Sequence, residues 1–176
     1  MRNKIFIMLL GCLLLGLSCD KNEDVPAGHD LLFQQDIFIP AGIGAFDVHH
    51  FQIKNIPTRY DQALELNGKK SEDISRVLTL QSTMAGVFGD ADFAFIDQVS
   101  LRVFDASDPT DFVEIAYRYP MPLNPGNNLP LIPSLADSKR FFEKSHISLD
   151  LVLWLRNTTQ TETDVRLSLQ MRAAHK

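Results

Sequence analysis

The sequence predicts an all-β domain: an antiparallel two-sheet sandwich, Ig-like or jelly-roll-like, with one or two short connecting helices. Apolar and polar residues alternate along several short segments, which is the period of a strand with one buried face. Turn-rich segments separate these strands. The two helices that the sequence suggests are too short to form a layer, which favours a sandwich.

The clearest strand runs from Asp164 to Arg172, where odd-numbered residues are apolar and even-numbered residues are polar. A longer strand runs from His146 to Arg156 with apolar odd-numbered residues, so Asp150 is expected at the surface. Five further strands are expected at Phe33–Ile39, Val48–Lys54, Ile74–Met84, Val99–Val103 and Val113–Tyr117. The last two are expected to form a hairpin.

Two short helices have recognisable start signals. Thr58 with Asp61 predicts a capped helix over Arg59–Leu66 that stops at an Asn-Gly pair. Ser134 with Asp137 predicts one or two further helical turns that end near residue 142.

Size and composition fit one globular domain. The 176 residues, 45% of them hydrophobic and 22% charged, suffice for one sizeable core but not for two ordinary domains. The formal net charge is -5. Nucleic acid is therefore not an expected partner, because neutralising phosphates requires a basic face.

The chain begins with the pattern of a signal peptide. Two positive charges within Met1–Lys4 precede the apolar run Ile5–Leu17, and the small residue Ser18 precedes Cys19. The run is shorter than the ~20 apolar residues of a membrane-spanning helix. The segment Leu15–Cys19 resembles the lipobox of bacterial lipoproteins, whose cysteine is acylated and becomes the new N-terminus. The resemblance implies that Cys19 is lipidated and anchors the domain to a membrane.

A second cysteine, Cys12, follows letters that fit the lipobox better. Cleavage there would leave only Ile5–Leu10 as the apolar core, whereas signal cores run roughly 7 to 15 residues. We therefore prefer Cys19. Removal of Cys12 and lipidation of Cys19 leave the domain without a free thiol, which excludes disulfides, thiolate zinc sites and cysteine nucleophiles.

The segment behind Cys19 bears on location. Its acidic residues, with the pair Glu23-Asp24, resemble the surface-export signal of Bacteroidota lipoproteins, whereas Asp20 directly after the cysteine resembles the inner-membrane retention signal of enterobacteria. We favour the first resemblance, which implies an outer-membrane anchor with the domain surface-exposed or, alternatively, facing the periplasm. The chain then divides into a signal peptide (1–18), a lipidated cysteine with an acidic tether (19–30) and a β-sandwich domain (31–176).

No metal site and no cofactor is predicted. Neighbouring strand residues point to opposite faces, so His49 and His50 cannot chelate one ion together. The carboxylates of Asp105, Asp108 and Asp111 lack the residue order of an EF-hand and are expected to form an ordinary turn, although calcium binding by this loop stays open.

A proline-rich segment, 120–133, holds five of the nine prolines and is interpreted as a stiff crossover, although long loops are often binding elements. Trp154 lies on the strand face opposite the leucines and is either a binding platform or, by preference, a cover for a second small core. The candidate binding surface comprises Trp154, Met121, Leu123, Asn127 and Asn128.

The expected function is a non-enzymatic one, because the sequence holds none of the familiar catalytic motifs. We expect a lipid-anchored envelope protein that binds envelope proteins or glycans or has a structural role. The alternative is a carbohydrate-binding or glycan-processing accessory protein. That alternative requires two or three exposed coplanar rings among Tyr60, Tyr117, Tyr119 and Trp154.

Overall fold

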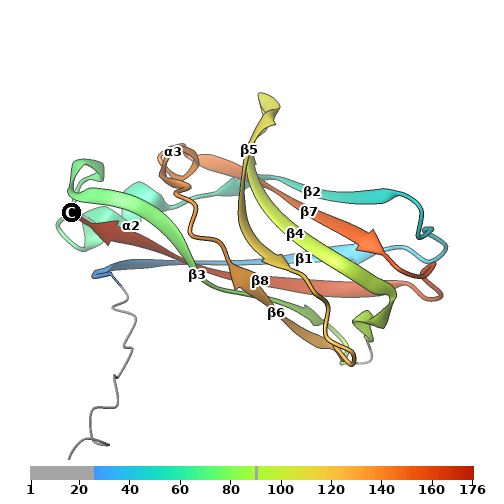
Figure 1. Ribbon diagram of the computed structural model, residues 1–176. Helices are drawn as coiled ribbons and strands as arrows, with labels where there is room; N and C mark the ends of the chain where they lie inside the picture. The colour runs from blue at the N-terminus through green and yellow to red at the C-terminus, as the bar shows by residue number, and fades with distance from the viewer. Residues whose placement is uncertain (1–25, 90) are drawn as a thin grey trace, which may run out of the picture.

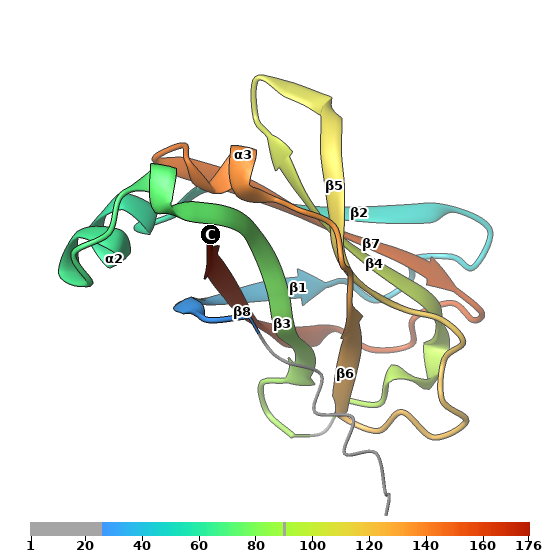
Figure 2. The same cartoon turned by 60° about the vertical axis from the view of Figure 1, so that its left-hand side comes forward.

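In the computed structural model, which describes residues 26–89 and 91–176, eight strands form an antiparallel sheet in the order β1-β8-β3-β6-β5-β4-β7-β2 (Figure 1). The strands are β1 (Gly28–Ile39), β2 (Val48–Pro57), β3 (Ile74–Gly86), β4 (Ile96–Asp105), β5 (Asp108–Arg118), β6 (Asn128–Pro133), β7 (His146–Leu155) and β8 (Thr163–His175). The sheet rolls up until it is nearly closed, with β1 and β2 as its two edges (Figure 2). The prediction of an all-β antiparallel fold is confirmed.

The pairing between β5 and β6, here called the join, involves the fewest residues of any strand pair in the sheet. These strands pair only where Ala116 lies opposite Pro133 and Tyr117 opposite Ile132. The join separates the half β1-β8-β3-β6 from the half β2-β7-β4-β5.

The core lies inside the rolled sheet and follows the predicted alternation. On β7, the odd-numbered residues from Ile147 to Leu155 are buried in the main cluster, as are those of β8 from Val165 to Ala173. Each such side chain contributes about 1.5–3 kcal/mol by leaving water. The sheet is therefore held chiefly by the inner faces of its strands.

Short helices close one end. Helix α2 (Tyr60–Leu66) lies where the sequence predicts it, but Thr58 is buried and its hydroxyl donates to the carbonyl of Lys144 at 2.7 Å. Helix α3 (Lys139–Phe142) is a single turn that ends at residue 142, as predicted, but it begins later than Ser134. Asp137 before it accepts hydrogen bonds from the backbone of Val77 and Lys139, both at 2.9 Å.

The structure corrects the interpretation of 120–133 as a crossover without strand structure. Residues 128–133 form β6, in which Leu129 and Leu131 are buried and Pro130 is exposed. Proline lacks the N–H of a ladder bond and argues against a central strand. It is tolerated here because residues 128–131 pair with β3 alone and the β5 pairing begins beyond them.

Two further expectations are wrong. Strand β1 begins at Gly28, inside the predicted tether 19–30, so Gly28, His29 and Asp30 belong to the folded domain. Asp150, expected at the surface, is only 7% exposed. Its Oδ2 lies 2.8 Å from Nδ1 of His50, which shields it.

Candidate functional site

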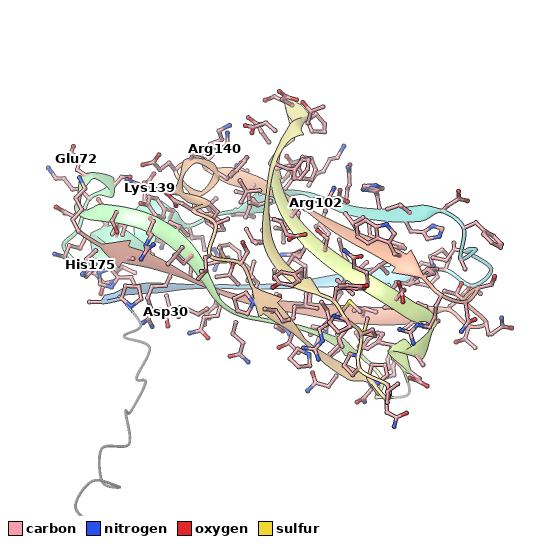
Figure 3. All side chains as sticks on the ribbon, viewed as in Figure 1. Asp30, Glu72, Arg102, Lys139, Arg140 and His175 are labelled. Atoms are coloured by element: carbon pink, nitrogen blue, oxygen red, sulfur yellow. The ribbon has the colours of Figure 1, made fainter. Side chains whose placement is uncertain are left out.

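Four connections meet at one end of the rolled sheet, here called the loop end (Figure 1). They join β1 to β2 (40–47), β3 to β4 (87–89 and 91–95), β5 to β6 (119–127) and β7 to β8 (156–162). The opposite end, here called the terminal end, holds both helices, the start of β1 and the end of β8. In Figure 3, Asp30 and His175 both lie at this terminal end.

Backbone hydrogen bonds tie the four connections together. The N–H of Gly42 donates to Thr159 at 2.9 Å, that of Val87 to Asp164 at 2.9 Å, and that of Phe93 to the carbonyl of Gly126 at 3.0 Å. Loop backbone groups need such partners when they are withdrawn from water. The loop end is therefore a structured surface.

Thr159 organises the junction between the first and last of these connections. It is 3% exposed, and its hydroxyl accepts from the N–H of Ile43 at 3.0 Å and donates to the carbonyl of Pro40 at 2.9 Å. The segment Asn157-Thr158-Thr159 lies in the connection between β7 and β8. The hydroxyl of Thr159 therefore ties the β7–β8 connection to the β1–β2 connection.

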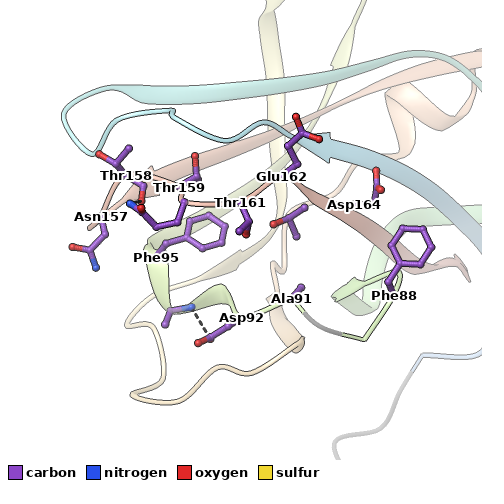
Figure 4. Close-up of a pocket in the computed structure, with 13 residues that line it drawn as sticks. Phe88, Ala91, Asp92, Phe95, Asn157, Thr158, Thr159, Thr161, Glu162 and Asp164 are labelled. Carbon is purple, nitrogen blue, oxygen red and sulfur yellow. Dashed lines mark hydrogen bonds between the residues drawn. The ribbon is translucent and has the colours of Figure 1, made fainter.

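A cavity of about 840 Å³ opens at the loop end (Figure 4). Its lining combines phenylalanine rings, threonine hydroxyls and carboxylates, namely Phe88, Phe95, Thr161, Asp92, Glu162 and Asp164. Phe88 is 76% exposed. The size falls within the 300–1,000 Å³ of small-molecule sites.

The negative charge that lines this cavity favours ligands that donate hydrogen bonds. Three carboxylates line it, whereas its described lining holds no lysine, arginine or histidine. Asp92 uses one carboxylate oxygen to accept from the N–H of Ala94 at 3.0 Å (Figure 4). Hydroxyls and ammonium groups are therefore better matched to this surface than anions are.

The residues that the sequence nominated are divided by the fold. Asn127 is at the loop end, where its side-chain amide donates to the carbonyl of Gly89 at 2.9 Å; Gly89 has φ +78°, a conformation that favours glycine. Leu123, in the same connection, is 94% exposed. Asn128 is exposed at the start of β6. Met121 belongs to the core, which corrects its assignment to the binding surface.

Trp154 is half-buried on the outer face of β7, with Val48 and Gln98 as its cross-strand neighbours. Cys19 lies outside the described residues. No local pattern in the sequence singled out the cavity-lining residues within 88–89, 91–95 and 157–164. The threonine-rich stretch 158–163 was the available signal, but nothing in its spacing distinguishes a cavity wall from a surface loop.

The carboxylates of the proposed calcium loop have separate partners. Asp105 pairs with Lys144, Asp108 accepts from Thr110 at 2.6 Å, and Asp111 pairs with Arg140 through two hydrogen bonds of 2.5 and 2.7 Å. The Lys144 ammonium is the main reason why the pKa of Asp105 falls well below its ordinary value. Within the described ranges, no group of three or more histidine, cysteine or acidic side chains is arranged to hold a metal ion.

Comparisons with known proteins add little. No family model matches the chain, and no curated protein matches it. Among solved structures, a chain of the cyanophage Pam1 capsid asymmetric unit is similar, at 11% identity over 89% of this chain and 99% of that chain, with a TM-score of 0.43. A similarity this distant carries no argument about function. Among the residues that the structure describes, no helix is both long and apolar enough to span a membrane.

Proposed function

We propose that this protein is a lipid-anchored envelope protein whose β-domain is a non-enzymatic binding module, with the loop end as its binding surface. The observation that carries the proposal is the course of β1. Its first residue, Gly28, lies opposite Ala174 at the terminal end, and its last, Ile39, lies opposite Thr163 at the loop end. At ~3.3 Å per residue the strand separates the two ends by about 36 Å.

This separation matters because the anchor would attach at the terminal end. The segment between Cys19 and Gly28 can reach at most about 30 Å when fully extended. A lipid on Cys19 would therefore keep the terminal end within about 30 Å of the membrane, whereas the loop end can lie up to about 36 Å further out. The outer membrane is the proposed location, with the domain at the cell surface or, alternatively, facing the periplasm.

We also propose that the sheet is a two-sheet sandwich of the jelly-roll type rather than the Ig type. The strand order supports this, because the halves β1-β8-β3-β6 and β2-β7-β4-β5 interleave along the chain. Consecutive strands alternate between halves except for the β4–β5 hairpin, as in an eight-stranded double Greek key. Such folds host many unrelated functions, so the proposal rests on the loop end.

His50 and Asp150 do not complete a serine triad with Ser100, which lies two strands away. His50 is hydrogen-bonded to Asp150, the pairing that orients a catalytic base. The register nevertheless places Val152 of β7 between His50 and Ser100, and two strand spacings amount to about 9.5 Å. The Ser100 hydroxyl is therefore beyond the reach of this histidine.

The glycan alternative lacks the ring platform that it required. Tyr60 is 1% exposed, and Tyr117 and Trp154 are half-buried. Tyr119, at 58% exposure, is the exposed member of the four. A sugar would need a different surface from the one that the sequence suggested.

The experiment compares the two ends of the anchored protein in cells. A photo-crosslinking amino acid is placed at Leu123 of the loop end or, as a matched control, at Leu66 of α2, which is 80% exposed at the terminal end. We expect a discrete cross-linked envelope component from position 123 and none from position 66. Equal products from both positions, or none from position 123, would contradict the proposal.

The anchor is tested in the same cells. Cys19→Ala should move the protein from the membrane fraction to the soluble fraction and abolish labelling with a fatty-acid analogue. Membrane association and labelling that survive this change would exclude Cys19 as the anchor.

A further inference from the structure

Away from the loop end, the outer face of the half β2-β7-β4-β5 carries a smaller cleft of about 310 Å³. Gln52, Asp150 and Arg102 are cross-strand neighbours on β2, β7 and β4 and form one row across it. The remaining lining residues come from the same strands and the start of β5, namely His50, Phe104, Pro109, Thr110 and Phe112. Figure 3 locates Arg102 on β4, beside the projecting β4–β5 hairpin.

The two opposite charges in this row do not neutralise each other. Arg102 lies opposite Asp150 in the register, yet its Nε donates to the Ser100 hydroxyl at 3.2 Å and its guanidinium lies 4.5 Å from the centre of the Phe112 ring. Within the described residues, the terminal nitrogens of Arg102 have no hydrogen-bond partner. The guanidinium of Arg102 can therefore donate hydrogen bonds to a ligand in the cleft.

Asp150 is equally incomplete as an acceptor. Its Oδ2 lies 2.8 Å from Nδ1 of His50, while its Oδ1 is buried without a partner in the described structure. Because an ionised carboxylate only accepts, Nδ1 of His50 donates and the outer nitrogen of a neutral ring is left to accept. Oδ1 itself is covered, so the groups that a ligand meets first are those of Arg102, Gln52 and His50.

The charge balance indicates the kind of ligand. Arg102 lies opposite Asp150 of β7 on one side and Glu114 of β5 on the other, and the Glu114 carboxylate accepts from the Ser100 hydroxyl at 2.5 Å. A charged ligand of either sign would therefore meet a like charge, a cation at Arg102 and an anion at Asp150 and Glu114. A neutral ligand that both donates and accepts hydrogen bonds meets neither penalty.

The lining and the size of the cleft limit the class of ligand further. Phe112 and Pro109, both exposed, give it an apolar wall beside the polar row, and the buried Phe104 packs beneath them. A sugar ring combines hydroxyls, which donate and accept, with apolar C–H faces, and the cleft lies at the small end of the usual range for ligand sites. We propose that this cleft binds a neutral sugar residue, with Arg102 and Gln52 bonding its hydroxyls and Phe112 flanking its ring.

The test uses the full chain in a detergent without a sugar headgroup. Saturation-transfer NMR and calorimetry with glucose, galactose, mannose and N-acetylglucosamine measure binding. The variants are Gln52→Ala, at an exposed position, and Arg102→Met, which keeps an unbranched side chain over Phe112 but removes the charge. Gln34→Ala, on an exposed residue of β1 in the other half, is the matched control.

We expect at least one of these sugars to bind, and each cleft variant to weaken its binding about tenfold, equivalent to about 1.4 kcal/mol. Gln34→Ala should leave the affinity unchanged. Denaturant midpoints show whether Arg102→Met remains folded, and Gln52→Ala carries the test if it does not. The proposal is overturned if no sugar in the panel binds, if both cleft variants bind like the unaltered protein, or if glycine or acetate binds in place of the sugars. The cross-linking experiment probes the loop end, which is a different surface. Its result therefore does not decide whether the cleft binds a sugar.

Discussion

The two halves of the sheet obey the same sequence alternation but differ in their outer faces. On β8, Arg166 is partly exposed and pairs with Asp36 across to β1 through hydrogen bonds of 2.7 and 2.8 Å. On β7, the corresponding outer residues Ser148, Asp150 and Val152 are at most 7% exposed. Alternation thus distinguishes the two faces of a strand, but it does not reveal whether the outer face is exposed to solvent.

Neighbouring side chains account for the difference. Phe104, which is 2% exposed, lies opposite Ser148 on β4, and Trp154 follows Val152 on the same face of β7. The outer neighbours on β1, β8 and β3 are instead mostly glutamine, serine and threonine. Large rings on β4 and on β7 itself exclude water from the outer face of β7, whereas small polar groups leave that of β8 solvated.

The largest expected effect lies on the inner faces, where the halves should behave alike. Leu153→Ala on β7 and Leu169→Ala on β8 should each reduce the free energy of unfolding by about 2–5 kcal/mol, because both side chains are at most 3% exposed in the core. Denaturant unfolding measures both costs. A cost near zero at either position would mean that the register of that strand is wrong.

Substitutions on the outer faces of the two halves should have different effects on stability. Asp150→Ala should destabilise the protein by about 1–2 kcal/mol, because it removes the hydrogen bond to His50 and leaves a gap in a packed layer. Asp36→Ala, in an exposed ion pair with Arg166, should not measurably move the denaturant midpoint. Equal midpoints for the two variants would show that the face around Asp150 is as solvated as that around Asp36.

The smallest effect is a pH dependence at the terminal end of the β1-β8 half. Burial and then the nearby His175 and Lys69 lower the pKa of His29 below 6.5, and its Nε2 lies 3.0 Å from that of His175. The folded protein therefore binds this proton less readily than the unfolded chain. Stability should decline as pH falls through about 6.5, because protonation favours the unfolded chain.

Melting temperatures between pH 7.5 and 5 measure this dependence. His29→Gln should flatten it, whereas His146→Gln, at an exposed position on β7, should leave it unchanged. An identical pH profile for His29→Gln and the unaltered protein would rule out His29 as the cause.

Seven of the eight described strands and α2 were predicted from local patterns, since alternation and turn residues are properties of neighbouring positions. Strand β6 was missed because its prolines argue against a ladder, and only its pairing with β3 along one side makes Pro130 tolerable. The nominated surface residues are divided by the fold. Leu123 and Asn127 do reach the loop end, whereas Met121 turns into the core, and no local pattern distinguishes these outcomes.

The sequence by itself determined which strand faces are apolar, because alternation depends on residues adjacent in the chain. The lipidation of Cys19 stays a prediction. Tertiary structure decided what those faces meet. It buried Asp150 beside His50, joined the β1–β2 and β7–β8 connections around Thr159, and placed Arg102 next to Asp150 without an ion pair among the described residues. These features depend on which strands become neighbours, and that choice is made by the pairing of segments up to a hundred or more residues apart.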